Sequence, residues 1–297
     1  MTTSVEIKIK IYQMKIIKLV LAIIILFISF TSCSDDNNDA INIDENPLAD
    51  YTMLASFKAN YHTIELYSEL EQLTIGYNEL FIRIKDDATD SYISDAEISW
   101  NPVMHMTAMM HSCPNSAVSK TDNSTVYNGY IVFQMPSNTE EYWDLTLDYV
   151  YNNQSYTVTE QIEVKSPVDD KQRVTVFTGS DDVRYVLAMM PISPKVAVND
   201  FSAMLFKMES MMSFPAVENY EILIDPRMPS MGNHSSPNNE DLSYDATAKM
   251  YTGKLSLTMT GYWKLNLKVL NEIGELTKGE TITDEMERSS LYFEIEI

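Results

Sequence analysis

One set of short motifs occurs twice along the chain, in the same order. The offset between equivalent positions is 123 to 124 residues over most of the set and falls to 120 at its last motif. An internal period of this kind predicts a tandem duplication. The first set is Pro102-x-Met104, His111-x-x-Pro114, Tyr127-x-Gly129 and Tyr142-Trp143, and the second is Pro226-x-Met228, His234-x-x-Pro237, Tyr251-x-Gly253 and Tyr262-Trp263.

Short apolar and β-branched segments recur throughout both halves, as in TIELY, ELFIRI, DLTLDYVY, YEILI and WKLNLKV. Each is bounded by Asn, Asp, Gly, Pro or Ser, which is typical of strands, and no long amphipathic helix is predicted between them. We therefore expect an all-β protein with two tandem immunoglobulin-like β-sandwich domains, residues 51–165 and 166–297. The segment SPVDDKQ, residues 166–172, has the Pro and charge content of a linker.

The N-terminal segment has the composition of a targeting signal. Lys15 and Lys18 precede a largely apolar run from Leu19 to Phe30, which is shorter than the roughly 20 residues a membrane-spanning helix needs. Residues 1–32 are therefore predicted to be a signal peptide. Either Met1 or Met14 would serve as its start.

A cysteine follows the small residues Thr31 and Ser32 and resembles the lipidated cysteine of bacterial lipoproteins. The next residues, SDDNNDA, resemble the acidic tract of Bacteroidota-type surface lipoproteins. The resemblance implies a lipoprotein signal peptide, lipid on Cys33, and an outer-membrane protein that faces the periplasm or the cell surface. Residues 33–50 are rich in Asp and Asn and are expected to form a disordered tether. The alternative is a secreted protein in which Cys33 has no such role.

The chain is strongly acidic, with a formal net charge of −22. Removal of residues 1–32 would take away four lysines and one glutamate and bring the charge to −25. Such a field repels nucleic acid and attracts cations, so no nucleic-acid partner is expected.

Soft metal donors are concentrated in the stretch WNPVMHMTAMMHSCP, residues 100–114. Thioether and thiolate groups favour Cu(I), whereas imidazole also binds zinc, iron and nickel, and Cys113 would be the one thiol left in a lipidated chain. The equivalent stretch of the second copy contains fewer donors. The candidate metal ligands are Met104, Met106, Met109, His111 and Cys113 in the first copy, and Met228, Met231 and His234 in the second.

Methionine is also an adaptable filler of hydrophobic cores. This packing interpretation is preferred for the second copy, whereas the metal interpretation is preferred for the first. Met135 and Met208 are expected in the core. Met211 and Met212 precede Pro215 at a predicted turn and could face the second copy's loop.

The sequence MPSMGNH at Met228–His234, followed by GYWKLNL at Gly261–Leu267, resembles the YtkA-like domain, which is related to the FixH-like group. The resemblance covers most of residues 175–270 and, more loosely, residues 70–165. It implies an immunoglobulin-like sandwich outside the cytoplasmic membrane. Some members of the family are associated with copper handling or cytochrome oxidase assembly. Gly232 has no counterpart in the first copy.

The sequence lacks a phosphate-binding glycine loop, an HExxH motif and a CxxC pair, so we do not expect an enzyme. The sequence predicts a lipid-anchored envelope protein that binds Cu(I) for capture, buffering or delivery, with a copper donor or acceptor protein as partner. The alternative is a spacer or interaction module without metal, whose methionines form a contact patch. Carbohydrate binding is a third possibility, consistent with the 18 tyrosines.

Overall fold

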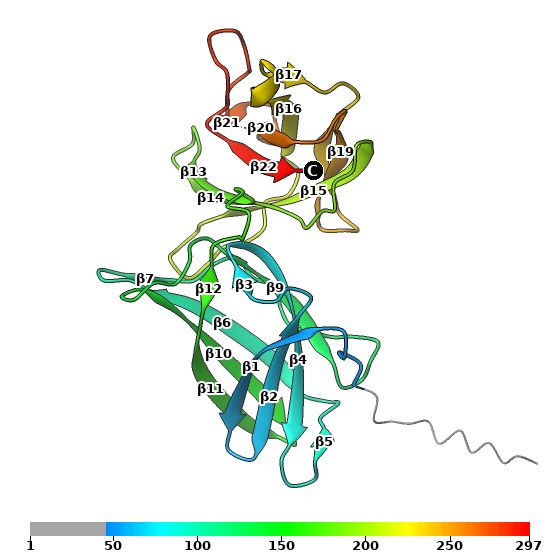
Figure 1. Ribbon diagram of the computed structural model, residues 1–297. Coiled ribbons are helices and arrows are strands. Elements are labelled where there is room, and N and C mark those ends of the chain that lie inside the picture. The colour runs from blue at the N-terminus through cyan, green and yellow to red at the C-terminus, as the bar shows by residue number, and fades with distance from the viewer. Residues whose placement is uncertain (1–45) are drawn as a thin grey trace, which may run out of the picture. The chain divides into compact units, whose positions relative to one another are not determined.

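The computed structural model describes residues 46–297 (Figure 1). The predicted signal peptide, Cys33 and most of the predicted tether lie outside the described residues. Within residues 46–297 the protein is all-β, and its one helical element is the short 3₁₀ helix η1, Pro229–Met231. No helix in this part of the chain is long and apolar enough to cross a membrane.

The first half of the described chain forms two main antiparallel sheets. One has the order β1 (Thr52–Ala59), β2 (His62–Ser68), β4 (Gly76–Asp86), β9 (Tyr127–Phe133) and β8 (Ser119–Lys120), with β5 (Ser91–Tyr92) paired to β4. The other has the order β11 (Gln154–Ile162), β10 (Tyr142–Tyr151), β6 (Glu97–His105) and β7 (Met110–His111). A short parallel pair joins β3 (Leu73–Thr74) to β12 (Val164–Lys165).

Alternation of apolar residues explains how these two sheets pack. In β6, Trp100 and Met104 are buried, whereas Asn101 between them is exposed. In β10, Trp143 and Leu145 are buried on the same face. Because successive side chains of a strand point to opposite faces, each sheet presents one apolar side. The two apolar sides share a single core cluster, as expected of a β-sandwich.

The second half forms one sheet of ten strands that encloses its own core. Strand β18 pairs with both β19 and β16, and its register with β19 shifts between Glu240 and Ser243. This shift lets one sheet bend over the core in a sandwich or barrel-like arrangement. The order is β13 (Val174–Thr178), β14 (Arg184–Met189), β15 (Val198–Lys207), β19 (Met250–Ser256), β18 (Glu240–Asp245), β16 (Glu221–Met228), β20 (Tyr262–Leu270) and β21 (Leu276–Lys278), with β17 (His234–Ser235) on β16 and β22 (Tyr292–Glu296) on β20.

The repeated motifs have equivalent strand pairing in the two halves. Met104 lies opposite His111 on β7, and Met228 lies opposite His234 on β17. The two tryptophans are also equivalent in their hydrogen bonds. The indole of Trp143 donates to the carbonyl of Met135 at 3.0 Å, and that of Trp263 donates to the carbonyl of Met259 at 3.1 Å.

Two asparagines give a second equivalence. The side chain of Asn78 accepts from the amide of Thr74 and donates to the carbonyls of Thr74 and Gly76. Asn199 makes the same three bonds to Lys195 and Ala197. Equivalent local geometry at both positions is what a tandem duplication predicts. The domain boundaries at residues 51, 165 and 166 stay a prediction.

Residues Pro47–Ile297 form one compact unit. An apolar cluster connects the two halves within it. Val132 of β9 packs there with side chains from β13, β14 and β15, and Tyr77 and Tyr130 lie at its edge. The buried members from the second half are Val174, Val186, Ala188, Met204 and Phe206.

Candidate functional site

The methionine-rich stretch of the first half forms a hairpin between β6 and β7. The amide of Met106 donates a hydrogen bond to the carbonyl of Met109 at 2.9 Å, which closes a four-residue turn. Two methionines therefore flank the turn at its base. Beyond the turn, strand alternation exposes Met110 and buries His111.

A cavity of about 360 Å³ lies beside this hairpin. Its lining contains five thioethers and one imidazole, together with apolar side chains, Gln134 and the exposed Arg184. No carboxylate lines it. We call it the methionine cavity, defined by Met106, Met109, His111, Met135, Met208 and Met211.

His111 is held in one tautomer. Its Nδ1 lies 2.7 Å from the carbonyl oxygen of Ser112, and a carbonyl oxygen can only accept. Nδ1 therefore carries the hydrogen, and in the neutral ring Nε2 keeps the lone pair. The ring also makes an edge contact with Trp143, at 5.6 Å between ring centroids. A backbone acceptor on the remote nitrogen is the usual arrangement of a metal-binding histidine.

The second half contributes a loop that ends near Pro215. The amide of Met208 donates to the carbonyl of Arg184 at 2.7 Å, and the amide of Lys207 donates to the carbonyl of Pro215 at 3.0 Å. The carbonyl of Met211 accepts the amide hydrogen of Ser112 at 2.8 Å. The expectation that Met211 faces the second copy's loop was therefore wrong, because Met211 faces the first.

Sequence reasoning did not place Met135 and Met208 at this site. Strand periodicity predicts a core position for Met208, and recurrence in both copies predicts one for Met135, whereas each side chain is half-buried. Met135 packs against the first core while it lines the methionine cavity. The equivalence of Met135 and Met259 predicts a packing role for both. The sequence contains no signal that distinguishes the cavity position of Met135 from the position of Met259.

Two further predicted ligands of the first half lie in its core instead. Met104 is fully buried on β6, opposite Trp143. Cys113 is buried as well, and desolvation raises the pKa of its thiol well above the usual value. The neutral thiol is a poor ligand and nucleophile, since the thiolate is the reactive form. Neither side chain lines the methionine cavity.

The three predicted ligands of the second half differ in burial. Met228 is buried in the second core, whereas Met231 on η1 and His234 on β17 are exposed. Among residues 46–297, no group of three or more His, Cys, Asp or Glu side chains is arranged to hold a metal ion.

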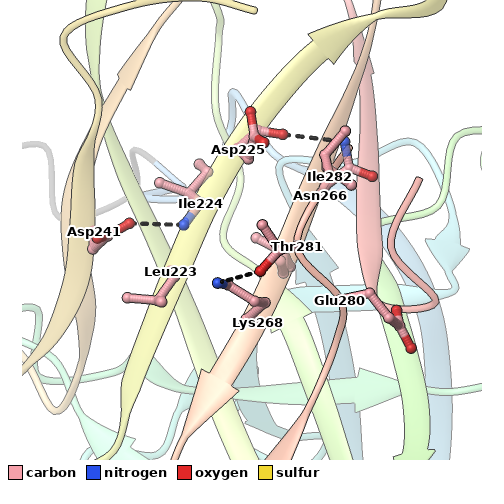
Figure 2. A pocket seen from close by; sticks show the side chains of 10 residues that line it. Leu223, Ile224, Asp225, Asp241, Asn266, Lys268, Glu280, Thr281 and Ile282 are labelled. Carbon is pink, nitrogen blue, oxygen red and sulfur yellow. Dashed lines mark hydrogen bonds between the residues drawn. The ribbon is translucent and has the colours of Figure 1, made fainter. Parts of the chain in front are cut away.

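A second hollow, of about 200 Å³, lies over β16 and β20 (Figure 2). Asp241 accepts the amide hydrogen of Ile224 at 2.8 Å, and Asn266 donates to the carbonyl of Asp225 at 3.1 Å. Lys268 donates to the hydroxyl of Thr281 at 3.0 Å. These polar groups bond to one another and to backbone, which indicates a structural role, and the hollow contains no soft donor.

No protein-family model matches the chain, and no curated protein matches it. Among solved structures, a DUF4785 family protein from Legionella pneumophila subsp. pneumophila str. Philadelphia 1 aligns with 9% sequence identity and a TM-score of 0.25. The alignment covers 73% of this chain and 55% of that chain. The chain thus spans about half the length of that protein, and a TM-score this low supports no inference about function.

Proposed function

We propose that this protein binds Cu(I) in the methionine cavity and captures, buffers or delivers copper at the cell envelope. The presence of five thioethers and His111 in the lining of one cavity carries the proposal. Thioether sulfur and imidazole are soft or intermediate donors and suit Cu(I) better than hard cations. The fixed tautomer of His111 provides the nitrogen ligand without a further rearrangement of protons.

The charge of the site and of the chain supports a monovalent soft cation. The cavity is lined by neutral donors and has no carboxylate, which makes it a poor site for Ca²⁺ or Mg²⁺. The formal net charge of −22 raises the local concentration of cations around the molecule. Arg184 opposes this at the cavity, but its side chain is exposed and its field is screened by solvent.

The proposed location and partner rest on the sequence expectations. Lipid on Cys33 would anchor the protein to the outer membrane, and the two YtkA-like copies would stand outside the cytoplasmic membrane. A copper donor or acceptor protein would exchange the ion through Met109 and Met211, which are 48% and 44% exposed. The proposed role is binding and transfer, not catalysis.

The second candidate function is a protein-interaction module that binds no metal. Four exposed methionines favour it, since flexible thioether side chains form adaptable contact surfaces. They are Met109, Met110, Met211 and Met212.

Anaerobic titration of residues 34–297 with Cu(I), against a chromogenic chelator, tests the proposal. We expect one equivalent to be bound, and the double variant Met106→Leu/Met109→Leu to lose it. Leucine conserves volume and removes the sulfur. The control is Met110→Leu, because Met110 is adjacent, 57% exposed and outside the cavity lining.

Thermal unfolding gives an independent measure of binding. Cu(I) at about 100 times its dissociation constant should add about 2.7 kcal/mol to the free energy of unfolding. If the wild-type protein neither competes with the chelator nor gains stability, copper binding is wrong. The interaction module would then be the remaining candidate.

A further inference from the structure

The donors of the methionine cavity come from both halves of the molecule. Met106, Met109, His111 and Met135 belong to the first half, and Met208 and Met211 belong to the second. We propose that a single Cu(I) ion bridges the two halves, with Met211 and Met208 as ligands from the second half. The inference rests on the proposed function and identifies what the ion does at that site.

The contact that positions Met211 is a backbone bond between the halves. The amide of Ser112 donates to the carbonyl of Met211 at 2.8 Å, directly beside His111. The side chains of His111 and Met211 therefore enter the same cavity from opposite segments of the chain. Met208 is fixed next to them, since its own amide is bonded to Arg184.

The donors are arranged by depth. Met109 and Met211 are 48% and 44% exposed and mark the mouth, one from each half. Met106, Met135 and Met208 are half-buried, and His111 is buried. Cu(I) entering at the mouth would first meet one thioether from each half. A site that uses both of these thioethers would draw on both halves, although the first half alone supplies four donors, Met106, Met109, His111 and Met135.

Bridging couples copper binding to the docking of the halves. A ligand shifts a conformational equilibrium only by its differential affinity for the two states. An ion that has all its ligands only when the halves are docked favours the docked state. The backbone bond from Ser112 to Met211 joins the two halves, so opening of this bond would report their separation.

Two adjacent methionines of the second half supply a matched test. Met211 lines the cavity, whereas Met212 is 49% exposed and does not line it. We expect Met211→Leu to weaken Cu(I) binding at least about tenfold, since even residues behind the ligands cost that much in metal sites. Met208→Leu should also weaken binding, and Met212→Leu should leave the affinity within about twofold of wild type.

Amide hydrogen exchange at Ser112 measures the coupling directly. Cu(I) should slow this exchange in the wild-type protein and in Met212→Leu, but much less in Met211→Leu. Equal Cu(I) affinities of Met211→Leu and Met212→Leu, with weakened binding in Met109→Leu, would overturn the bridge and leave the proposed function intact. Failure of the wild-type protein to bind Cu(I) would overturn both.

Discussion

The amide of Ser112 and the carbonyl of Met211 form a 2.8 Å hydrogen bond between segments far apart in the sequence. This bond brings a loop of the second half against the β6–β7 hairpin of the first. His111, next to Ser112, and Met211 both line the methionine cavity, so the bond lies where the two loops meet. The β6–β7 hairpin contributes Met106, Met109 and His111 to the cavity, and the loop of the second half contributes Met208 and Met211.

Cys113 should not react with thiol reagents in the folded protein. Burial raises the pKa of its thiol, so the thiolate is scarce at neutral pH, and the side chain is only 1% exposed. Residues 34–297 should therefore resist iodoacetamide at pH 8 and become fully alkylated in urea. The extent of modification is measured by mass. Rapid alkylation without urea would show that the segment around Cys113 opens readily.

Alkaline pH should destabilise the protein, and Tyr67 should contribute to the effect. Burial, helped by the hydrogen bond to Glu65, raises the pKa of Tyr67 to about 12 from its usual value near 10. In the unfolded chain the phenol loses its proton near pH 10, while the folded protein retains it. The unfolded state thus binds fewer protons between about pH 10 and pH 12, and the free energy of unfolding falls as the pH rises through this window.

Urea unfolding of the wild type and of Tyr67→Phe at pH 8 and at pH 11 measures this contribution. Phenylalanine has no proton to lose, so the variant should lose less stability between the two pH values. The variant should still lose some stability at pH 11, because its other buried tyrosines also ionise more readily in the unfolded chain. Identical losses in the two proteins would mean that Tyr67 ionises equally in both states.

The two equivalent asparagines should differ in importance because they differ in burial. Asn78 is fully buried, so Asn78→Ala would leave buried backbone groups without partners and cost about 3 kcal/mol. Asn199 makes the same bonds and also donates to the carbonyl of Leu255, but it is partly exposed, and water can replace these partners. We expect about 1 kcal/mol for Asn199→Ala. Urea denaturation checks both values, and equal losses would contradict the burial argument.

The all-β class could be predicted from the sequence because apolar alternation and turn residues are local signals. The repeated Tyr-Trp motif predicts equivalent positions for Trp143 and Trp263, and the indole of each donates to a methionine carbonyl. These features depend on residues close together in the chain.

The composition of the methionine cavity could not be predicted in the same way. Met135 and Met208 read as strand residues, and their place beside Met109 depends on how the halves pack through Val132 and Phe206. Met104 lies on β6, whereas Met106 follows the end of this strand at the hairpin turn. Met104 is fully buried in the core, and Met106, which also packs against that core, lines the cavity.

This difference between Met104 and Met106 gives the last prediction. Met104 is fully buried, so Met104→Leu should change stability by less than about 1.5 kcal/mol and leave Cu(I) affinity unchanged. Met104→Ala should cost about 2–5 kcal/mol by creating a cavity in the core. Met106→Leu should weaken Cu(I) binding with little change in stability.

Urea unfolding and chelator competition on the three variants separate the two roles. Met110→Leu serves as the control for loss of an exposed thioether from the same hairpin. Weakened Cu(I) binding in Met104→Leu would mean that the ion is held deeper than the methionine cavity, among the core residues beside Trp143. Because leucine fills the volume of methionine without its sulfur, such a loss would have to come from the missing donor and not from altered packing.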